Sequence, residues 1–196
     1  IALSIKEGNL LSAFDTMDNL ASLKKHDIGV GNPQLVSTVW KEYQLNELFD
    51  ICKGERLTKP NQVPGKIPLI TAGEDNNGIT SKIDFETFKE SKKYFKNTLT
   101  IDMFFNTFYH DYIYFSDDNI HTLVLKEEFS EKANKYSYLF VVTVLNSNKF
   151  KYSYGRQVRL SRLANEYIVL PSKENGEPDW EFMEEYIKTI PYSSSI

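Results

Sequence analysis

The spacing of apolar residues predicts a helix near the N-terminus. Within residues 1–28, apolar side chains recur at the three- and four-residue intervals of a helix with one buried face: Leu10, Leu11, Phe14, Met17, Leu20 and Leu23. Residues 29–33, which include two glycines and a proline, then interrupt the pattern. We therefore expect residues 1–38 to form a helical connector and residues 39–196 to form the main domain.

The centre of the chain is predicted to be rich in strands. Residues 40–45, 67–71 and 99–126 alternate apolar with polar positions and contain many β-branched and aromatic residues. Pro68 favours an edge position, because proline donates no hydrogen bond to a neighbouring strand. Residues 73–78 end in Asn-Asn-Gly and are predicted to form a tight turn, because these residue types tolerate positive φ angles.

The C-terminal half predicts two longer helices, a short basic helix and a strand. Residues 134–148 favour a helix over a buried strand, because their apolar positions fit a 3.6-residue period. Residues 155–164 are predicted to be a short basic helix and residues 167–171 a strand. A last helix is expected over about residues 179–190, since Pro178 and the acidic residues after it suit a first helical turn. The predicted fold class is α+β, with mixed, strand-rich central sheets, a short basic helix and flanking N- and C-terminal helices.

Composition narrows the class of protein. A chain of 196 residues can form one domain with a small appendage. Cys52 is the one cysteine of the sequence, which excludes an internal disulfide and a multi-cysteine zinc site and favours a reducing cytoplasm. The apolar run 139–145 is far shorter than the roughly 18 residues of a membrane span, and no signal peptide is recognisable. We expect a cytoplasmic protein that does not contact membranes.

Charge is distributed unevenly along the chain. Residues 132–165 contain no Asp or Glu and carry a charge of +7, whereas the whole chain carries −4, so that the remaining residues carry −11. The seven cations of this stretch are Lys132, Lys135, Lys149, Lys151, Arg156, Arg159 and Arg162. Such asymmetry indicates a basic face on an acidic body, which suits a nucleic-acid partner. Chance clustering of cations on a solvated surface is the alternative.

The arginines form the sharpest candidate site. On a helix, side chains three positions apart lie on one side, so Arg156, Arg159 and Arg162 are predicted to form one cationic edge. Arginine pairs with phosphates and guanine, and Gln157 is of the type that pairs with adenine. Two tyrosines that can donate to phosphate precede the arginines, and three apolar residues are expected to face the protein: Tyr152, Tyr154, Val158, Leu160 and Leu163. The alternative is an exposed amphipathic helix with surface ion pairs, which the lack of acidic residues nearby disfavours.

Two loops supply further candidates for binding. The loop from Lys53 to Lys66 mixes cations with Thr and Gly, as loops that hold a DNA backbone do, although a plain solvated loop is the alternative. Its candidate residues are Lys53, Arg56 and Lys59. In the turn after residue 70, glycine allows close approach of a backbone and asparagine can read a base edge. The candidates there are Thr71, Gly73, Asn76 and Asn77.

Sequence patterns of catalytic and metal sites are absent. The three histidines are scattered, and the nucleophile-elbow, HExxH, dinucleotide-binding and P-loop motifs do not occur. Acidic residues followed by lysine have the wrong spacing for a nuclease, and the motifs of a methyltransferase are missing. His110 is predicted to be a satisfied or surface histidine, with DNA contact from the end of its strand as the alternative. We therefore expect no catalytic residue, no metal ion and no cofactor.

Four segments, in this order and spacing, together resemble a known family. They are residues 48–54, residues 67–79, residues 154–171 and residues 176–187. Over roughly residues 41–192 the chain resembles the target-recognition domains of type I restriction specificity subunits, and the related domains that end type IIG and BcgI-like enzymes. The segment Thr100-Ile101-Asp102 falls where this family has a central strand.

The resemblance implies an α+β domain that reads double-stranded DNA and performs no chemistry itself. It further implies a helix that packs on a methyltransferase or on a second recognition domain. S-adenosylmethionine would be bound by the methyltransferase subunit or domain, and ATP by the restriction subunit where one exists.

Two features depart from the family pattern. Full specificity subunits contain two such domains, whereas this sequence has one, and residues 1–40 lie outside the resemblance. A half-subunit that forms a homodimer and a piece of a fused enzyme both fit this pattern. Separately, the acidic pair Asp117-Asp118 argues against DNA contact by the turn that contains it. A fragment with nuclease or methyltransferase activity, or a protein-interaction module without DNA binding, are the alternatives.

Overall fold

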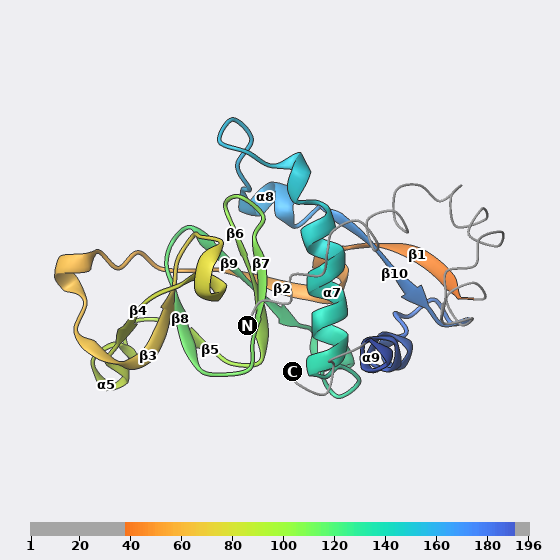
Figure 1. The fold of residues 1–196 in the computed structure, drawn as a ribbon, viewed down its shortest axis with the longest axis horizontal. Helices are drawn as coiled ribbons and strands as arrows, with labels where there is room; N and C mark the ends of the chain where they lie inside the picture. Colours follow the sequence, from red (N-terminus) through yellow and green to blue (C-terminus); the bar gives the residue numbers. More distant parts are fainter. Residues whose placement is uncertain (1–37, 191–196) are drawn as a thin grey trace.

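The computed structural model describes residues 38–190, and the helical connector predicted for residues 1–38 lies outside this range except for its last residue. Within residues 38–190 the strands form three sheets (Figure 1). The smallest sheet pairs β1 (Val39–Gln44) with β10 (Tyr167–Ser172) in antiparallel fashion, so residues far apart in sequence lie side by side.

The two larger sheets have four strands each. One is antiparallel throughout and has the order β2 (Phe49–Lys53), β9 (Ile120–Leu125), β6 (Thr98–Asp102) and β7 (Thr107–His110). The other has the order β4 (Ile79–Ile83), β3 (Pro64–Ile70), β8 (Tyr114–Ser116) and β5 (Tyr94–Phe95), and its β3–β8 pair is parallel. The strands predicted across residues 99–126 are thus confirmed, but they are shared between two sheets.

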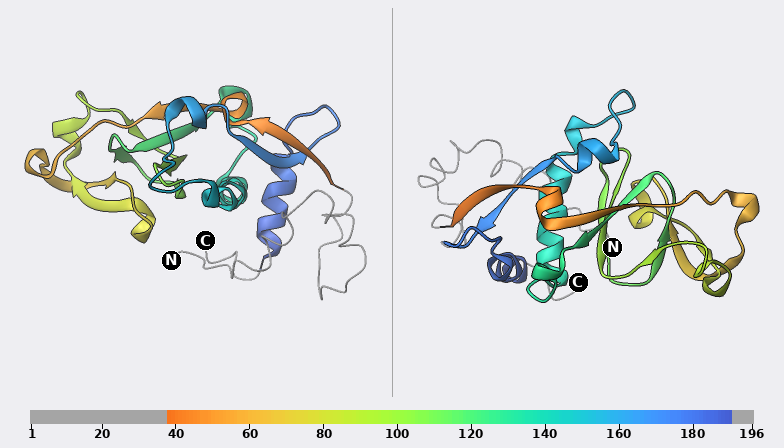
Figure 2. Two further views of the ribbon diagram at one scale, coloured as in Figure 1. Left: turned by 90° about the horizontal axis from the view of Figure 1, so that it is seen from above. Right: turned by 180° about the vertical axis from the view of Figure 1, so that it is seen from behind.

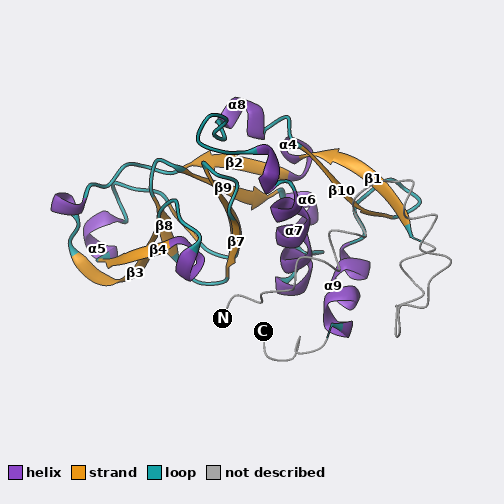
Figure 3. Cartoon of the chain, turned by 45° about the horizontal axis from the view of Figure 1, so that its top comes forward, coloured by secondary structure: helices purple, strands orange, loops and turns teal. Residues whose placement is uncertain are grey.

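Of two longer helices, α7 (Lys135–Ser147) lies beside β7 of the first large sheet, and α9 (Trp180–Thr189) packs on α7 and β10 (Figures 1 and 2). The side chain of Asn134 caps α7 and that of Asp179 caps α9, each accepting from first-turn N–H groups. The remaining helical turns are α4 (Leu45–Leu48), α5 (Phe85–Phe88), α6 (Glu127–Ser130), α8 (Leu160–Leu163), η2 (Lys59–Asn61), η3 (Asp75–Gly78) and η4 (Lys149–Lys151). The predicted α+β class is confirmed, as Figure 3 shows.

Apolar clusters support these layers, and two of them contain the most residues. The larger core lies between the β2–β9–β6–β7 sheet and the helices α7 and α9, with Leu99, Val141 and Met183 fully buried. A smaller core under the other sheet contains Leu69 and Phe115. Apolar burial of this kind is the main favourable contribution to folding, so each large sheet has its own source of stability.

A buried polar cluster links the two large sheets. The hydroxyls of Thr98 and Tyr114 lie 2.8 Å apart, and the Tyr114 hydroxyl donates to Thr122. Beside them, the ring nitrogens of His110 bond to Thr100 at 2.8 Å and to Tyr112 at 2.9 Å. Because a buried polar group without a partner is costly, this set of matched partners helps to fix how the sheets meet.

The short basic helix predicted for residues 155–164 is wrong in extent. Only Leu160–Leu163 is helical, and Arg159 before it is extended, with φ −127° and ψ 146°. The N–H of Arg156 donates to Ser153 O, and that of Val158 donates to Met103 O, each at 2.9 Å. The bond to Met103 gives the Val158 N–H a partner outside the segment in place of a helical i−4 carbonyl, and no local pattern reports such a contact.

Pro68 was also predicted to lie on an edge strand, and this is wrong for the strand as a whole. β3 is an inner strand between β4 and β8. However, β8 pairs only with Leu69 and Ile70, so Pro68 has a paired strand on one side alone, at Lys82 of β4. The missing N–H of proline is tolerated because the neighbouring strand ends before it.

Candidate nucleic-acid interface

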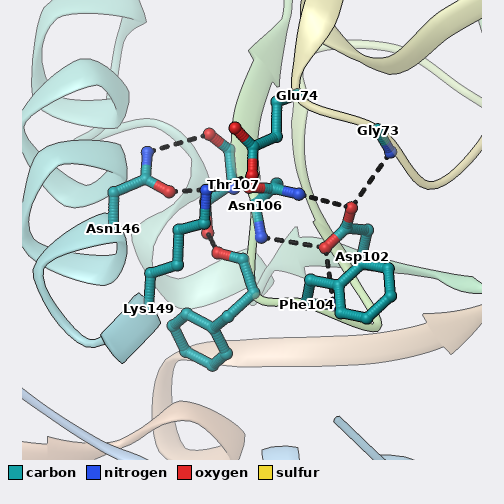
Figure 4. A network of polar contacts seen from close by, with 9 residues as sticks. Gly73, Glu74, Asp102, Phe104, Asn106, Thr107, Asn146 and Lys149 are labelled. Carbon is teal, nitrogen blue, oxygen red and sulfur yellow. Dashed lines mark hydrogen bonds and ion pairs between the residues drawn. The ribbon is translucent and has the colours of Figure 1, made fainter. Parts of the chain in front are cut away.

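A buried carboxylate at the end of β6 organises the candidate site (Figure 4). Asp102 is 2% exposed, and its Oδ1 accepts from the N–H groups of Phe104 at 2.8 Å and Asn106 at 2.9 Å. Its Oδ2 accepts from the side chain of Asn106 at 2.7 Å and from the N–H of Gly73 at 3.1 Å. One side chain therefore fixes the turn between β6 and β7 (residues 103–106) and also the loop that contains Gly73.

The same turn is tied to α7. The amide of Asn146 bonds to both main-chain groups of Thr107, accepting at 3.0 Å and donating at 3.1 Å (Figure 4). Such paired bonds imitate a strand neighbour and hold the start of β7 against the helix. Bonds from Asp102 and from Asn146 of α7 therefore hold the two ends of the 103–106 turn.

The 103–106 turn also contacts residues 152–163, which we name the arginine segment. Phe105 is fully buried with a positive φ of 69°, which is unusual for a bulky residue, and its ring stacks on Tyr152 at 4.6 Å. Phe104 packs on Tyr154 with ring centroids 4.9 Å apart, and Met103 O accepts from Val158. Three successive residues of the turn therefore contact the arginine segment.

Within the arginine segment, exposure follows residue type only in part. Arg156, Arg159 and Arg162 are exposed, and Gln157 is half-buried. Val158 and Leu163 are buried as predicted, whereas Leu160 was predicted to face the protein and is 42% exposed. The three arginines lie in a turn, at a helix N-cap and in α8 respectively, so the single helical edge predicted for them is wrong.

The two tyrosines of this segment differ in environment. Tyr154 is 86% exposed and stays a candidate for phosphate contact. Tyr152 is buried and its hydroxyl donates to Glu166 at 2.7 Å, so its predicted phosphate contact is wrong. Burial and the Glu166 carboxylate raise the pKa of Tyr152, partly offset by the nearby Arg162 and Arg156.

Six of the seven cations of the acid-free stretch fall into two classes. Three lysines form ion pairs with carboxylates from distant parts of the chain: Lys132 with Glu177 (2.8 Å), Lys149 with Glu74 (2.8 Å) and Lys151 with Glu166 (2.7 Å). Carboxylates that lie outside the acid-free stretch thus neutralise these three lysines. Within residues 38–190, by contrast, none of the three arginines has a carboxylate within ion-pair distance, and so they stay available to an anionic partner.

The loop after β3 lies next to the arginine segment through the 103–106 turn. Asn76, Asn77 and Gly78 have φ angles of 49°, 53° and 75°, which confirms the positive φ predicted for this turn. The N–H of Thr71 closes the turn by donating to the carbonyl oxygen of Gly78 at 2.9 Å. Asn76 is exposed, Asn77 is half-buried, and no atom lies within 4 Å of a Cβ built on Gly73.

The third candidate element, the 53–66 loop, lies elsewhere. Its η2 turn lies at the far end of the molecule from α8 in Figure 1, and again in the view from above in Figure 2. The loop is held against β8 and the residues after it, since Glu55 N donates to Ser116 O and Leu57 N to an Asp117 carboxylate oxygen. Lys53, Arg56 and Lys59 are all exposed. The candidate residues thus fall into two separate groups.

Residues 38–190 contain no group of three His, Cys, Asp or Glu side chains placed to hold a metal ion. His110 is fully buried with both ring nitrogens bonded, so the satisfied histidine is confirmed and its alternative role in DNA contact is wrong. Burial lowers the pKa of His110 to about 4. No helix between residues 38 and 190 has the length and apolar character to cross a membrane.

Comparison with known proteins identifies the family to which this chain belongs. Residues 38–193 match the family model of the type I restriction modification DNA specificity domain. The chain belongs to this family. It is 36% identical over 151 residues to the specificity subunit S.BcgI of a type II restriction enzyme from Heyndrickxia coagulans, an alignment that covers 76% of this chain and 42% of that subunit.

Solved structures of specificity subunits share the fold of this specificity domain. The S subunit of a type I restriction-modification system from M. genitalium has a TM-score of 0.53 at 21% identity, covering 76% of this chain and 37% of that one. The HsdS subunit from Thermoanaerobacter tengcongensis has a TM-score of 0.54 at 15% identity, covering 97% and 48%. The chain therefore spans less than half the length of these relatives.

Sequence analysis of the specificity domain missed two features of the site. Asp102 was noted only as part of a strand, although an Asp at a strand end followed by Asn four residues later is typical of a turn that caps its own backbone. Phe150, which is 83% exposed in η4, carried no signal in the sequence, because an isolated aromatic residue reads equally well as core.

Proposed function

We propose that this specificity domain binds double-stranded DNA and recognises a half-site of a few base pairs, mainly in the major groove. One observation carries the proposal: three exposed arginines without carboxylate partners in the described chain lie on a segment anchored to the same turn as the Asn76-Asn77 loop. Arginine without an internal partner is suited to phosphates and to guanine.

The candidate residues divide into two roles in this proposal, and this division differs from their division by position. Arg156, Gln157, Arg159, Asn76 and Asn77 contact base edges. Positioning on the sugar–phosphate backbone is assigned to the other candidates: Lys53, Arg56, Lys59, Thr71, Gly73, Tyr154 and Arg162. Contacts of the first kind specify a sequence, whereas contacts of the second kind only position the protein.

The domain itself performs no chemistry in this proposal. It directs a methyltransferase subunit or domain, and a restriction subunit, to the target, and it requires a second recognition domain or a second copy to read a full site. No cofactor is bound by this chain. The relatives are specificity subunits, which supports this assignment.

The proposal is tested by selecting duplexes from a randomised pool with the full chain. We expect a defined motif to be enriched, and its affinity to fall with salt at a slope of about 0.9 per neutralised phosphate. A pool that stays random after selection would reject sequence-specific recognition. Cleavage with Mg²⁺ or methyl transfer from S-adenosylmethionine by the chain alone would instead favour an enzyme. Binding of a protein partner that does not depend on salt would favour an interaction module.

A further inference from the structure

Three exposed apolar side chains lie close together in the sequence, within and just before the arginine segment. Within residues 38–190, large apolar residues with high exposure include Phe150 (83%), Tyr154 (86%) and Leu160 (42%), all within eleven positions of each other. They belong to the stretch from η4 to α8, which protrudes beyond the ends of β6 and β7 (Figures 1 and 3). Single exposed apolar residues are ordinary, but a group beside unpaired cations indicates a contact surface.

The flanking lysines fix the direction of Phe150. In a 3₁₀ turn there are three residues per turn, so the side chains of Lys149, Phe150 and Lys151 leave η4 in three different directions. Lys149 reaches Glu74 at 2.8 Å (Figure 4), and Lys151 reaches Glu166 at 2.7 Å. With both neighbours tied to the body of the domain, the phenyl ring occupies the remaining direction, away from it.

The two ion pairs also change what η4 offers to DNA. The charges of Lys149 and Lys151 are matched by Glu74 and Glu166, so the turn contributes little net positive charge. What it presents instead is a phenyl ring, which has no donor or acceptor. Among base edges in the major groove, the group read by such a ring is the 5-methyl of thymine.

We propose that Phe150 contacts the 5-methyl group of one thymine in the target site and so adds a base-specific contact to the arginine segment. This inference rests on the proposed function, since it requires the arginine segment to lie in the major groove. The arginines supply attraction to the flanking phosphates, and Phe150 supplies discrimination at one position. Tyr154 differs from Phe150 because its ring is braced on Phe104 and its hydroxyl can donate to phosphate.

The test uses the duplex that the full chain selects from a randomised pool. Each thymine is replaced in turn by uracil, which lacks only the methyl group, and binding is measured for the wild-type chain and for Phe150→Ala. We expect one uracil substitution to weaken wild-type binding about fourfold, the effect of one buried methyl-sized group. The same substitution should not affect Phe150→Ala, so that the two changes are not additive.

Two variants serve as controls. Val39→Ala removes another exposed apolar side chain, 64% exposed at the start of β1, and should keep the full response to uracil. Phe150→Leu keeps an apolar contact and should retain part of the response. Melting temperatures of all variants should match the wild type, because these side chains are exposed.

Each other outcome decides against the proposal. If the chain selects a motif but no uracil substitution weakens binding, or if Phe150→Ala responds like the wild type, the thymine contact is wrong while DNA recognition stands. If Phe150→Ala leaves DNA binding intact and weakens only the association with the methyltransferase, Phe150 contacts protein instead. If no duplex is selected at all, this inference and the proposed function both fall.

Discussion

The arginine segment and the 53–66 loop are both basic, but they are held in different ways. The arginine segment has few bonds within itself and is fixed by the 103–106 turn, whose geometry depends on Asp102. The 53–66 loop is fixed by main-chain bonds to the residues of β8 and beyond, and Leu57 anchors it in the smaller core. The two basic regions are therefore anchored on different parts of the fold.

The largest effect should follow Asp102→Ala. This change leaves the N–H groups of Gly73, Phe104 and Asn106 without their buried acceptor, and we expect a loss of about 4 kcal/mol in the free energy of unfolding. Chemical denaturation measures it, and Asp111→Ala, at an exposed aspartate, should change stability by about 0.5 kcal/mol or less.

Amide exchange on Asp102→Ala would sharpen the comparison. Protection should fall in the arginine segment and in the loop after β3, and should stay unchanged in the 53–66 loop. Equal loss of protection in both regions would show that they are not held independently.

Acid should weaken the polar cluster that links the two large sheets. Because burial lowers the pKa of folded His110 from 6.5 to about 4, the unfolded chain takes up a proton first as the pH falls. The stabilisation is fully present above pH 6.5 and is lost between there and about pH 4, by about 3 kcal/mol in total.

Denaturation at a series of pH values measures this effect, with His110→Gln as the control. Other groups also titrate in this range, so the informative quantity is the difference in pH dependence between the wild type and the variant. Identical pH dependence of the two proteins would exclude His110 as its source.

Gly54→Ala should affect the 53–66 loop alone. A Cβ on Gly54 would lie 2.1 Å from the carbonyl oxygen of Asp117, so the loop or its neighbour must move, at a cost of about 2 kcal/mol. Gly155→Ala is the matched change in the arginine segment, where no atom lies within 4 Å of the added Cβ, and it should be nearly neutral. Thermal unfolding of both variants checks this, and equal destabilisation would contradict it.

The last pair of changes compares how the arginine segment and the 53–66 loop contribute to DNA affinity. Arg156→Ala should weaken binding to the selected duplex by about 1–3 kcal/mol and relax preference at one base pair. Lys59→Ala should weaken binding to all duplexes alike and reduce the salt slope by about 1. Titrations on the selected and a scrambled duplex separate the two patterns, and uniform weakening by Arg156→Ala would remove it from base reading.

Much of the local structure followed from the sequence. The 3.6-residue period of residues 134–148 gives α7, the proline and acidic residues near 179 give α9, and the Asn-Asn-Gly run gives the left-handed turn at η3. Each is a property of neighbouring residues, namely which face is apolar and which φ angles a residue type tolerates. The sign of the charge on residues 132–165 was likewise fixed by composition alone.

Tertiary structure alone decided which of those charges are free. Lys149 finds its carboxylate 75 positions away in the chain and Lys132 finds its own 45 positions away, which no local pattern reports. The arginine segment similarly loses most of its predicted helix because Met103 O and the ring of Phe105 hold it in another form. The spacing of apolar residues indicates which face of a helix or strand is buried. The pairing of charges and the exposure of Phe150 depend instead on which distant segments the fold brings together.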